Sequence, residues 1–307
     1  MASYLIVRFS AIGDCVMAAY TATAIREKEP DATIDWAIET RCRPVLNEAS
    51  LINSIIDFPR DEWRRRGWPP SVWREQLSRF SALRKRRYEF GMDLQGHSKT
   101  AICLRIARPK RRIAAFATDA LSARLNPLLP GDPDSVHRVE RMLHAAQYFG
   151  DFGMPAAPIM PTYPAVISAK PRLVSMSTGA GAKVKQYPSE QWAQVGAALI
   201  AEGFKVALLG ASSDPKIAIR GAEDYVGKLS LSETMSVVAA STVHLAADTG
   251  TGHIAAAYGV PFVSVFGPTD PDLYRPYSLR GEVLRKSENP GDVSPEVILE
   301  SLRRLVG

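Results

Sequence analysis

The chain has 307 residues, 46% hydrophobic and 23% charged, which excludes a disordered or fibrous protein. Its three cysteines show no Cys-x-x-Cys spacing, which argues against a disulfide framework or a structural zinc site, and no run approaches 18 apolar residues. The net charge of +6 is uneven, because residues 60–141 hold 19 Lys and Arg against 9 Asp and Glu. That stretch is +10 and the remainder −4, an asymmetry that indicates an anionic partner or, alternatively, a solvated basic face.

The first half of the chain alternates strand-like apolar runs with helical patterns, which is typical of α/β domains. The predicted strands span residues 4–10, 34–38 and 90–96, and the predicted helices span 16–28 and 99–106. Asp14 follows Gly13 in the first strand-to-helix turn. There it can cap the helix or act as a general base.

Five prolines lie between Met154 and Arg172. Proline fixes φ and removes a backbone donor, so neither a continuous helix nor a central strand is expected there. We therefore predict an N-terminal domain over 1–153, a linker over 154–172 and a C-terminal domain over 173–307.

The α/β pattern restarts after the proline-rich segment. Strands are predicted at 172–179, 204–210, 243–248 and 261–267, and helices at 189–202, 216–225, 252–258 and 294–306, with a short helix from Ser232. The sequence thus predicts two α/β halves of similar size, the second closed by a C-terminal helix.

Polar residues interrupt an apolar stretch where the predicted strand 243–248 meets a helix. Asp248, Thr249 and Gly250 form the turn, and His253 lies in the first helical turn. Unpaired N–H groups and the positive end of the helix dipole bind anions, and glycine lets a phosphate approach the backbone. The alternative is structural, with Asp248 as a cap and His253 as an ordinary surface residue.

A second glycine-containing loop follows the predicted strand 172–179 and carries Lys183 and Lys185. It lacks the spacing of a Walker A loop, but a lysine there can neutralise a diphosphate leaving group. A solvated loop lysine is the alternative. Loops after parallel strands meet at the carboxyl edge of a sheet, so both anion-binding candidates are expected at one edge. No metal-binding motif supports a metal-dependent mechanism.

Several motifs together resemble the lipopolysaccharide heptosyltransferases of glycosyltransferase family nine. The chain contains D-T-G-x-x-H, G-V-P-x-V-x-V-F-G-P-T-D-P, R-F-S-A-I-G-D and K-x-Y-P. Its D-L-Q-G-H-S-K-T-A segment is most similar to heptosyltransferase I. The resemblance implies a GT-B fold, in which two Rossmann-like α/β domains face a central cleft, the first binding the acceptor and the second an ADP-sugar donor.

The resemblance also implies roles for individual residues. Asp14 is the implied base and Lys185 the diphosphate lysine, although the alignment leaves Lys183 open. The implied donor contacts are Ser177, Thr178, Asp248, Thr249, Gly250, His253 and Asp214, with Ser213 as the alternative to Asp214. The implied acceptor contacts are Arg60, Lys99 and Arg124.

From this resemblance we expect inverting, metal-independent transfer of heptose from ADP-heptose to Kdo of the inner core on lipid A, with no separate cofactor. We expect a cytoplasmic protein, neither exported nor membrane-spanning, favouring a monomer, in contact with the anionic inner face of the inner membrane and not with nucleic acid. The alternatives are another nucleotide sugar or a protein acceptor, and a catalytically silent module that binds a nucleotide sugar or an anionic lipid.

Overall fold

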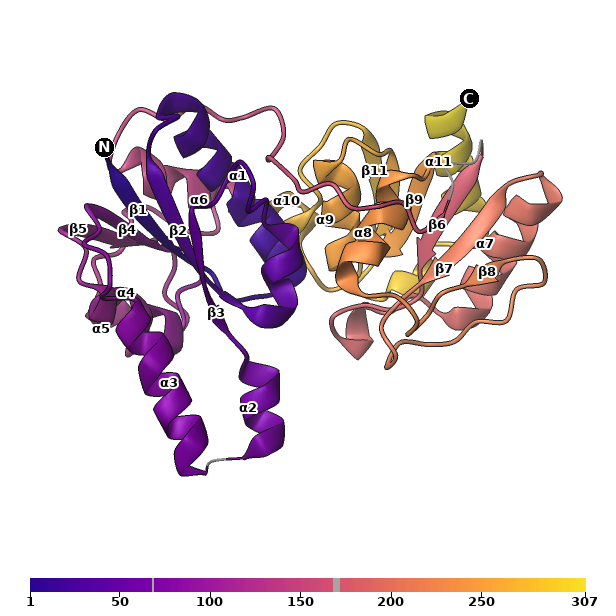
Figure 1. Cartoon of the computed structure of the whole chain (residues 1–307). Coiled ribbons are helices and arrows are strands. Elements are labelled where there is room, and N and C mark those ends of the chain that lie inside the picture. The colour runs from indigo at the N-terminus through magenta and orange to yellow at the C-terminus, as the bar shows by residue number, and fades with distance from the viewer. Residues whose placement is uncertain (68, 168–171) are drawn as a thin grey trace. The chain divides into compact units, whose positions relative to one another are not determined.

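The computed structural model describes residues 1–67, 69–167 and 172–307, which form two compact units, 1–161 and 162–307 (Figure 1). The division falls inside the proline-rich segment 154–172, whose residues 168–171 lie outside the described residues. None of the described helices is both long and apolar enough to cross a bilayer.

The first unit is built on a parallel sheet in the order β3-β2-β1-β4-β5. Its strands are β1 Ser3–Val7, β2 Thr33–Glu39, β3 Ser54–Phe58, β4 Phe90–Asp93 and β5 Arg111–Ala114. Its helices are α1 Ile12–Lys28, η1 Thr40–Val45, α2 Arg60–Arg66, α3 Pro70–Ala82, α4 Ser98–Ala107, α5 Ser122–Leu125 and α6 Arg138–Gln147. The strand order reverses between β1 and β4, so the loops after these two strands diverge at a topological switch point, where open α/β sheets bind ligands.

The second unit has a parallel sheet in the order β11-β10-β9-β6-β7-β8, which reverses between β6 and β9. Its strands are β6 Leu173–Ser177, β7 Lys205–Leu209, β8 Glu223–Asp224, β9 Val243–Ala247, β10 Phe262–Val265 and β11 Gly281–Leu284. Its helices are η2 Lys183–Lys185, α7 Ser189–Ala201, α8 Leu231–Ala239, α9 Gly250–Ala257, α10 Pro271–Tyr274, η3 Pro290–Asp292 and α11 Pro295–Val306. The loops after β6 and β9 are the two loops for which the sequence predicts anion-binding residues.

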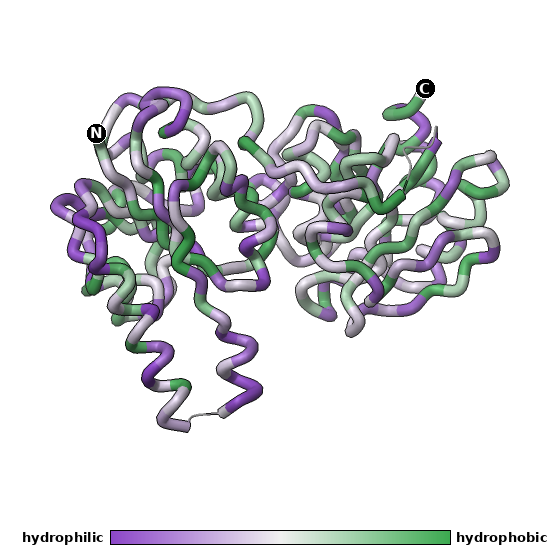
Figure 2. The backbone as a smooth tube through the Cα atoms, in the orientation of Figure 1, coloured by the Kyte–Doolittle hydropathy of each residue, from purple (hydrophilic) through white to green (hydrophobic). Residues whose placement is uncertain are grey.

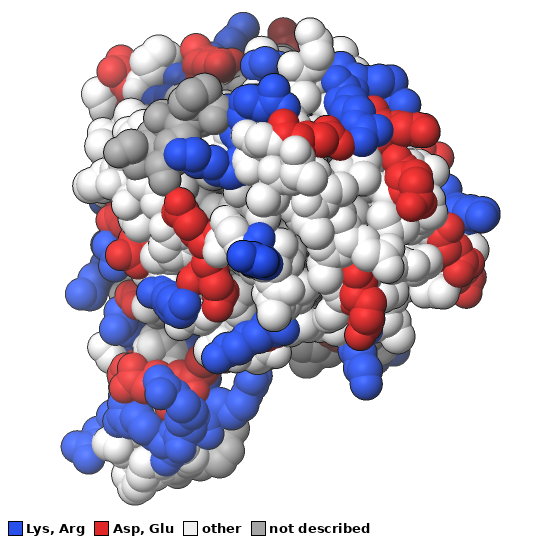
Figure 3. All heavy atoms as spheres, turned by 90° about the vertical axis from the view of Figure 1, so that its right-hand side faces the viewer, with Lys and Arg blue, Asp and Glu red and all other residues white. Residues whose placement is uncertain are grey.

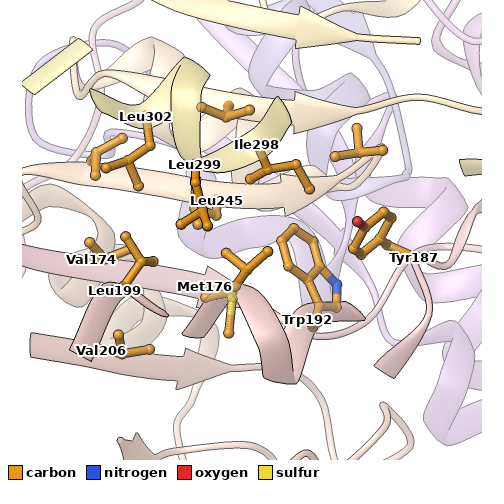
Figure 4. Close-up of a cluster of buried hydrophobic side chains, with 14 of the residues drawn as sticks. Val174, Met176, Tyr187, Trp192, Leu199, Val206, Leu245, Ile298, Leu299 and Leu302 are labelled. Carbon is orange, nitrogen blue, oxygen red and sulfur yellow. The ribbon is translucent and has the colours of Figure 1, made fainter. Parts of the chain in front are cut away.

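The alternation of side chains along the strands fixes the two faces of the second sheet. Val174 and Met176 lie two residues apart on β6 and enter the same buried cluster as Leu245 of β9 (Figure 4). Trp192 of α7 and Leu302 of α11 cover that cluster (Figure 4). The residues between these apolar positions point to the opposite face, since successive strand side chains alternate.

The hydropathy of the first unit separates its sheet from its helical extension. Apolar residues follow the strands, whereas α2 is mostly hydrophilic (Figure 2). Within α2, Trp63 is buried and the three arginines 64–66 are exposed. The extension therefore contributes little to the core and exposes much of the positive charge found in the sequence.

The predicted helix over 216–225 is wrong. The segment is irregular and ends in the short strand β8. Ile217 and Ile219 both contact the apolar cluster, and a spacing of two residues suits an extended chain rather than a helix. Gly221 adopts a φ of +89°, which also ends any helix there.

Candidate active site

Asp14 lies in the first turn of α1, directly after the carboxyl end of β1. It is not the N-cap, which is Ala11, but the third helical residue. Its Oδ2 atom is 2.7 Å from the Arg8 guanidinium and accepts a 3.0 Å hydrogen bond from the Ala11 N–H. No described residue donates to Oδ1, and 27% of the side chain is exposed, so one carboxylate oxygen is available to a proton donor.

Arg8 fixes this carboxylate from within the protein. Its side chain is only 8% exposed, and it also donates to the Leu94 carbonyl oxygen beyond β4. The Gln95 side chain accepts a 2.8 Å hydrogen bond from the Phe9 N–H. These contacts join the loops after β1 and β4, so Asp14 stands on a rigid part of the switch point.

Arg60 and Lys99 lie on helices that start at the carboxyl edge of the same sheet. Arg60 pairs with the buried Glu39 at the end of β2, and Arg41 donates to the same carboxylate at 3.0 Å. This group lines a surface pocket of about 260 Å³. The two arginines keep the pKa of Glu39 below its ordinary value, against the opposing effect of burial.

Lys99 is half-buried in the first turn of α4 and forms no ion pair with any described residue. Burial, with a smaller contribution from nearby Arg60, lowers its pKa. An anion that binds beside such a lysine stabilises its charged form. The anion supplies the opposite charge that the lysine lacks, and so offsets burial and the repulsion from Arg60. Arg124, in contrast, is exposed on α5, and the described residues offer it no ion pair either.

Lys185 and Asp248 form the corresponding charged pair of the second unit. The Lys185 Nζ atom is 2.7 Å from Asp248 Oδ2, which joins the loop after β6 to the loop after β9. The carboxylate is 9% exposed and the lysine 31%. Lys183 is exposed, and no described residue pairs with it.

The loop after β9 presents the start of a helix. Thr249 is the N-cap of α9, Gly250 is the first helical residue, and His253 is buried in the first turn. Asp248 precedes the cap and is therefore not a capping residue. The first N–H groups of a helix have no partner within it, so this turn offers donors to an anion.

Ser177, Thr178 and Asp214 lie at the adjoining edge of the sheet. Ser177 and Thr178 are buried where β6 ends. The Asp214 carboxylate accepts a 2.7 Å hydrogen bond from the Ala211 N–H, and a Cβ atom added to Gly179 would lie 2.1 Å from it. Ser213 is exposed. Glycine at 179 thus allows the Asp214 carboxylate to lie directly over the loop after β6.

Most of the chain matches one known protein family. The model of glycosyltransferase family 9 (heptosyltransferase) matches residues 76–296. The chain belongs to this family. Like its other members it is a glycosyltransferase enzyme, and the resemblance drawn from the sequence motifs is confirmed.

Individual relatives extend over nearly the whole chain. It is 26% identical to lipopolysaccharide heptosyltransferase 1 of Escherichia coli K12, over 98% of this chain and 99% of the relative. It is 27% identical to lipopolysaccharide heptosyltransferase 1 of Pseudomonas aeruginosa PAO1, over 93% and 84%. The structure of E. coli heptosyltransferase WaaC with ADP superposes with a TM-score of 0.83 at 20% identity, covering 99% of both chains. The predicted GT-B fold is confirmed.

The structure brings together some of the predicted residues and not others. Lys185 contacts Asp248, and the two lie in the segments that follow β6, which ends at Ser177, and β9, which leads to Thr249. Asp14, Arg60 and Lys99 share the carboxyl edge of the first sheet, whereas Arg124 lies on α5 and, among the described residues, forms no hydrogen bond or ion pair with any of them. Among the described residues no group of three or more acidic, histidine or cysteine side chains could hold a metal ion.

The sequence reasoning missed the residues that hold the site residues in place. Arg8 and Glu39 are buried charges at strand ends, and His244 is a buried imidazole within β9. Glu39 is followed by Thr40 and Arg41 and does not stand out, whereas Arg8 and His244 each interrupt an apolar run. That interruption was the available signal, since a buried charge or imidazole requires a partner.

Proposed function

We propose that the enzyme transfers heptose from ADP-heptose to a Kdo hydroxyl of the lipopolysaccharide inner core on lipid A, with inversion at the anomeric carbon. One observation carries the proposal. Each unit has a carboxylate–cation pair at its switch point, and the first unit exposes the carboxylate while the second exposes the cation. Proton abstraction and binding of a diphosphate need these two charges respectively.

The second unit would hold the donor. Lys185 offers its ammonium to the diphosphate, and the N–H groups of Gly250 and Thr251, for which the described residues provide no acceptor, lie at the start of α9. Because Asp248 already orients the lysine, little side-chain entropy is lost when the anion binds. Thr178, His253 and Asp214 complete the proposed donor site from the same edge.

The first unit would supply the base. As the anomeric carbon gains oxocarbenium-ion character, the acceptor hydroxyl forms the new C–O bond, its proton passes to Asp14 Oδ1, and ADP leaves with the electrons of the broken bond. Arg8 and the Ala11 N–H already bind Oδ2, so Oδ1 is the oxygen that would take the proton. One base and one displacement give inversion without a covalent intermediate.

Charge from the protein would stabilise the leaving diphosphate. A lysine ammonium and a helix N-terminus oppose the negative charge that develops on ADP, in the role that a metal ion has in other transferases. We therefore propose a metal-independent reaction.

The acceptor carries several negative charges, and Arg60, Lys99 and Arg124 would bind them. Lys99 is the strongest of the three candidates because it is half-buried and has no ion-pair partner among the described residues. Arg60 already neutralises Glu39, so it would share its guanidinium between that carboxylate and the substrate.

The acceptor also places the enzyme at an anionic membrane surface. Lys and Arg side chains gather at the bottom of the view in Figure 3, where α2 and α3 lie in Figure 1. On α3, Trp73 and Leu77 are 53% and 66% exposed and share one helix face, four residues apart. We propose a cytoplasmic monomer that binds the inner face of the inner membrane through this extension, at about 1 kcal/mol per basic residue near the surface.

The test is a transfer assay with purified ADP-heptose and Kdo-lipid A, read by mass spectrometry and by NMR of the new glycosidic bond. The proposal requires a product one heptose heavier with the anomeric configuration inverted. Parallel reactions contain other nucleotide sugars, and an acceptor that already carries one heptose. Preferential reaction of any of these would replace the proposed donor or acceptor, and ADP binding without transfer in every reaction would favour a silent binding module.

A further inference from the structure

A chain of buried hydrogen bonds runs beneath the first turn of α9. Ser175 Oγ is 2.9 Å from His244 Nδ1, His244 Nε2 is 3.0 Å from Thr251 Oγ1, and Thr251 Oγ1 is 2.7 Å from Ser177 Oγ. Ser175 and His244 are completely buried, and Ser177 is 3% exposed. The chain connects the interior of the sheet with the hydroxyl at the end of β6.

The strand register creates this arrangement. Ser175 pairs with His244 across β6 and β9, so their side chains share one face of the sheet. Val174 and Met176 point to the opposite face, into the apolar cluster. Sheet packing does not explain an imidazole here, because an apolar residue would fill the same position without needing two hydrogen-bond partners.

The imidazole is neutral, which gives the chain a direction. Burial lowers the pKa of His244 to about 3, and a hydrogen bond from the imidazole to the Ser175 backbone offsets only part of this lowering. A neutral imidazole has one N–H donor and one acceptor nitrogen. The tautomer therefore decides whether Thr251 donates to His244 or accepts from it, and with this whether the Thr251 proton is free for Ser177.

Only one of the two directions suits an anionic ligand. If Nε2 carries the proton, it donates to Thr251, whose own proton is then free to be donated to Ser177, and this arrangement leaves the Ser177 proton available. If Nδ1 carries the proton, Ser177 must donate to Thr251 and would present only lone pairs to a ligand. No described residue other than Thr251 pairs with the Ser177 hydroxyl.

We propose that His244 is a positioning residue that, as the Nε2–H tautomer, directs the Ser177 hydroxyl proton toward the diphosphate of the donor. This inference rests on the proposed donor site. It assigns His244 no contact with substrate, because its effect passes through Thr251 and Ser177. It also gives a role to the two serines and the imidazole that β6 and β9 place on the face opposite the apolar cluster.

The direct test is NMR of the full-length protein with ¹⁵N-labelled histidine and saturating ADP. We expect His244 to show a protonated Nε2 and an unprotonated Nδ1 at neutral pH. Its signals are assigned by elimination, with variants of the other four histidines. A protonated Nδ1 would overturn the proposal, and this measurement does not require a His244 variant to fold.

Binding of ADP and of adenosine gives an independent test. We expect His244→Phe to raise the Kd of ADP about tenfold, the range for a lost hydrogen bond to a charged group, with adenosine binding unchanged. His244→Gln, which keeps a donor near the Nε2 position, should recover most of the affinity. In a Ser177→Ala background, His244→Phe should cause no further loss.

The control is Ser241→Ala, which removes a buried hydroxyl bonded to the Val237 carbonyl just before β9. It should leave both affinities unchanged. Equal losses for ADP and adenosine in His244→Phe would show a structural role and overturn the proposal. Failure of the wild-type protein to bind ADP would instead remove the proposed function itself.

Discussion

The two units carry the same kind of charged pair with opposite exposure. In the first unit the cation Arg8 is 8% exposed and the carboxylate Asp14 is 27% exposed. In the second the carboxylate Asp248 is 9% exposed and the cation Lys185 is 31% exposed. The shortest N–O distance is 2.7 Å in both.

This difference shows that one architecture can present either sign of charge at the edge of its sheet. In each pair the buried member is fixed by the fold and holds its partner at the carboxyl edge of the sheet. Under the proposed function the exposed member would face substrate, as a proton acceptor in one unit and as an anion-binding group in the other. The proposal thus links the role of each pair to which of its members the fold buries.

The largest effect is expected from the exposed carboxylate. Asp14→Asn keeps the shape of the side chain and removes its capacity to take a proton, so kcat should fall by about 10²–10⁴-fold. Steady-state kinetics at saturating substrates measure this loss. Normal turnover combined with a lower Tm would reduce Asp14 to a structural member of the first turn of α1.

The second largest effect is expected from Lys185, the exposed cation of the second unit. Lys185→Ala should weaken ADP binding by about 10–100-fold, because a charge-assisted bond is lost and Asp248 remains buried without its cation. Lys183→Ala is the matched control, two residues away on the same loop and exposed, and should change the Kd less than about twofold. Calorimetry compares them, and the reverse order would move the diphosphate contact to Lys183.

Lowering the pH should change the stability of the two units in opposite directions. Burial raises the pKa of Asp93 from 3.8 to about 6, so its contribution to stability is present in acid and is lost as the pH rises through 6. Burial lowers the pKa of His244 from 6.5 to about 3, so its contribution is present above pH 6.5 and is lost as the pH falls.

Between pH 6.5 and 4.5 the first unit should gain roughly 2 kcal/mol of stability from Asp93, and the second should lose roughly 2 kcal/mol from His244. Hydrogen exchange of β4 and β9 amides, corrected for intrinsic rates, resolves the two units. Asp93→Asn and His244→Gln should each abolish the trend of their own unit only. Parallel trends in both units would contradict the opposed burial effects.

A smaller effect is expected at the acceptor cations. Arg60→Ala, Lys99→Ala and Arg124→Ala should each raise the acceptor KM by about three- to tenfold and leave donor binding unchanged. Added salt should weaken acceptor binding in the wild type more than in these variants, since the screening length is about 8 Å at 0.15 M. Arg105→Ala, exposed on the same helix as Lys99, is the control, and equal KM values in all proteins would remove the assignment.

No effect is expected from removal of divalent metal. Because Lys185 and the first turn of α9 would stabilise the leaving diphosphate, turnover in EDTA should stay within about twofold of the untreated value. A loss of turnover that magnesium or manganese restores would show that Lys185 and the first turn of α9 do not stabilise the leaving diphosphate sufficiently without a metal ion.

Local pattern was enough to predict much of the fold. Apolar runs and the loops that follow them predicted the two α/β halves, because period and turn residues act over a few positions. The segment at Ile217 and Ile219 was predicted wrongly, since both isoleucines reach the core from an irregular segment and only the tertiary structure shows this. The helical extension of α2 and α3 was also missed, within a stretch noted only for its charge.

The candidate site was predicted less completely. Motifs picked out Asp14, Lys185 and Asp248, but not which residues pair, since Lys185 and Asp248 are 63 positions apart. Arg8 was counted as part of a strand, and His244 as one residue of an apolar run. Partners across a sheet depend on strand order, which one sequence does not specify. The substrate roles of all these residues stay predictions.

The central claim is that the Arg8–Asp14 pair serves proton transfer and the Lys185–Asp248 pair serves diphosphate binding. One calorimetric series tests this claim most directly. It measures the Kd of ADP for the wild type, Asp14→Asn, Lys185→Ala and the double variant. We expect the two proteins with Lys185 to bind ADP equally, and the two without it to bind about 10–100-fold more weakly and equally. A change of more than about threefold on replacing Asp14, in either background, would contradict the claim.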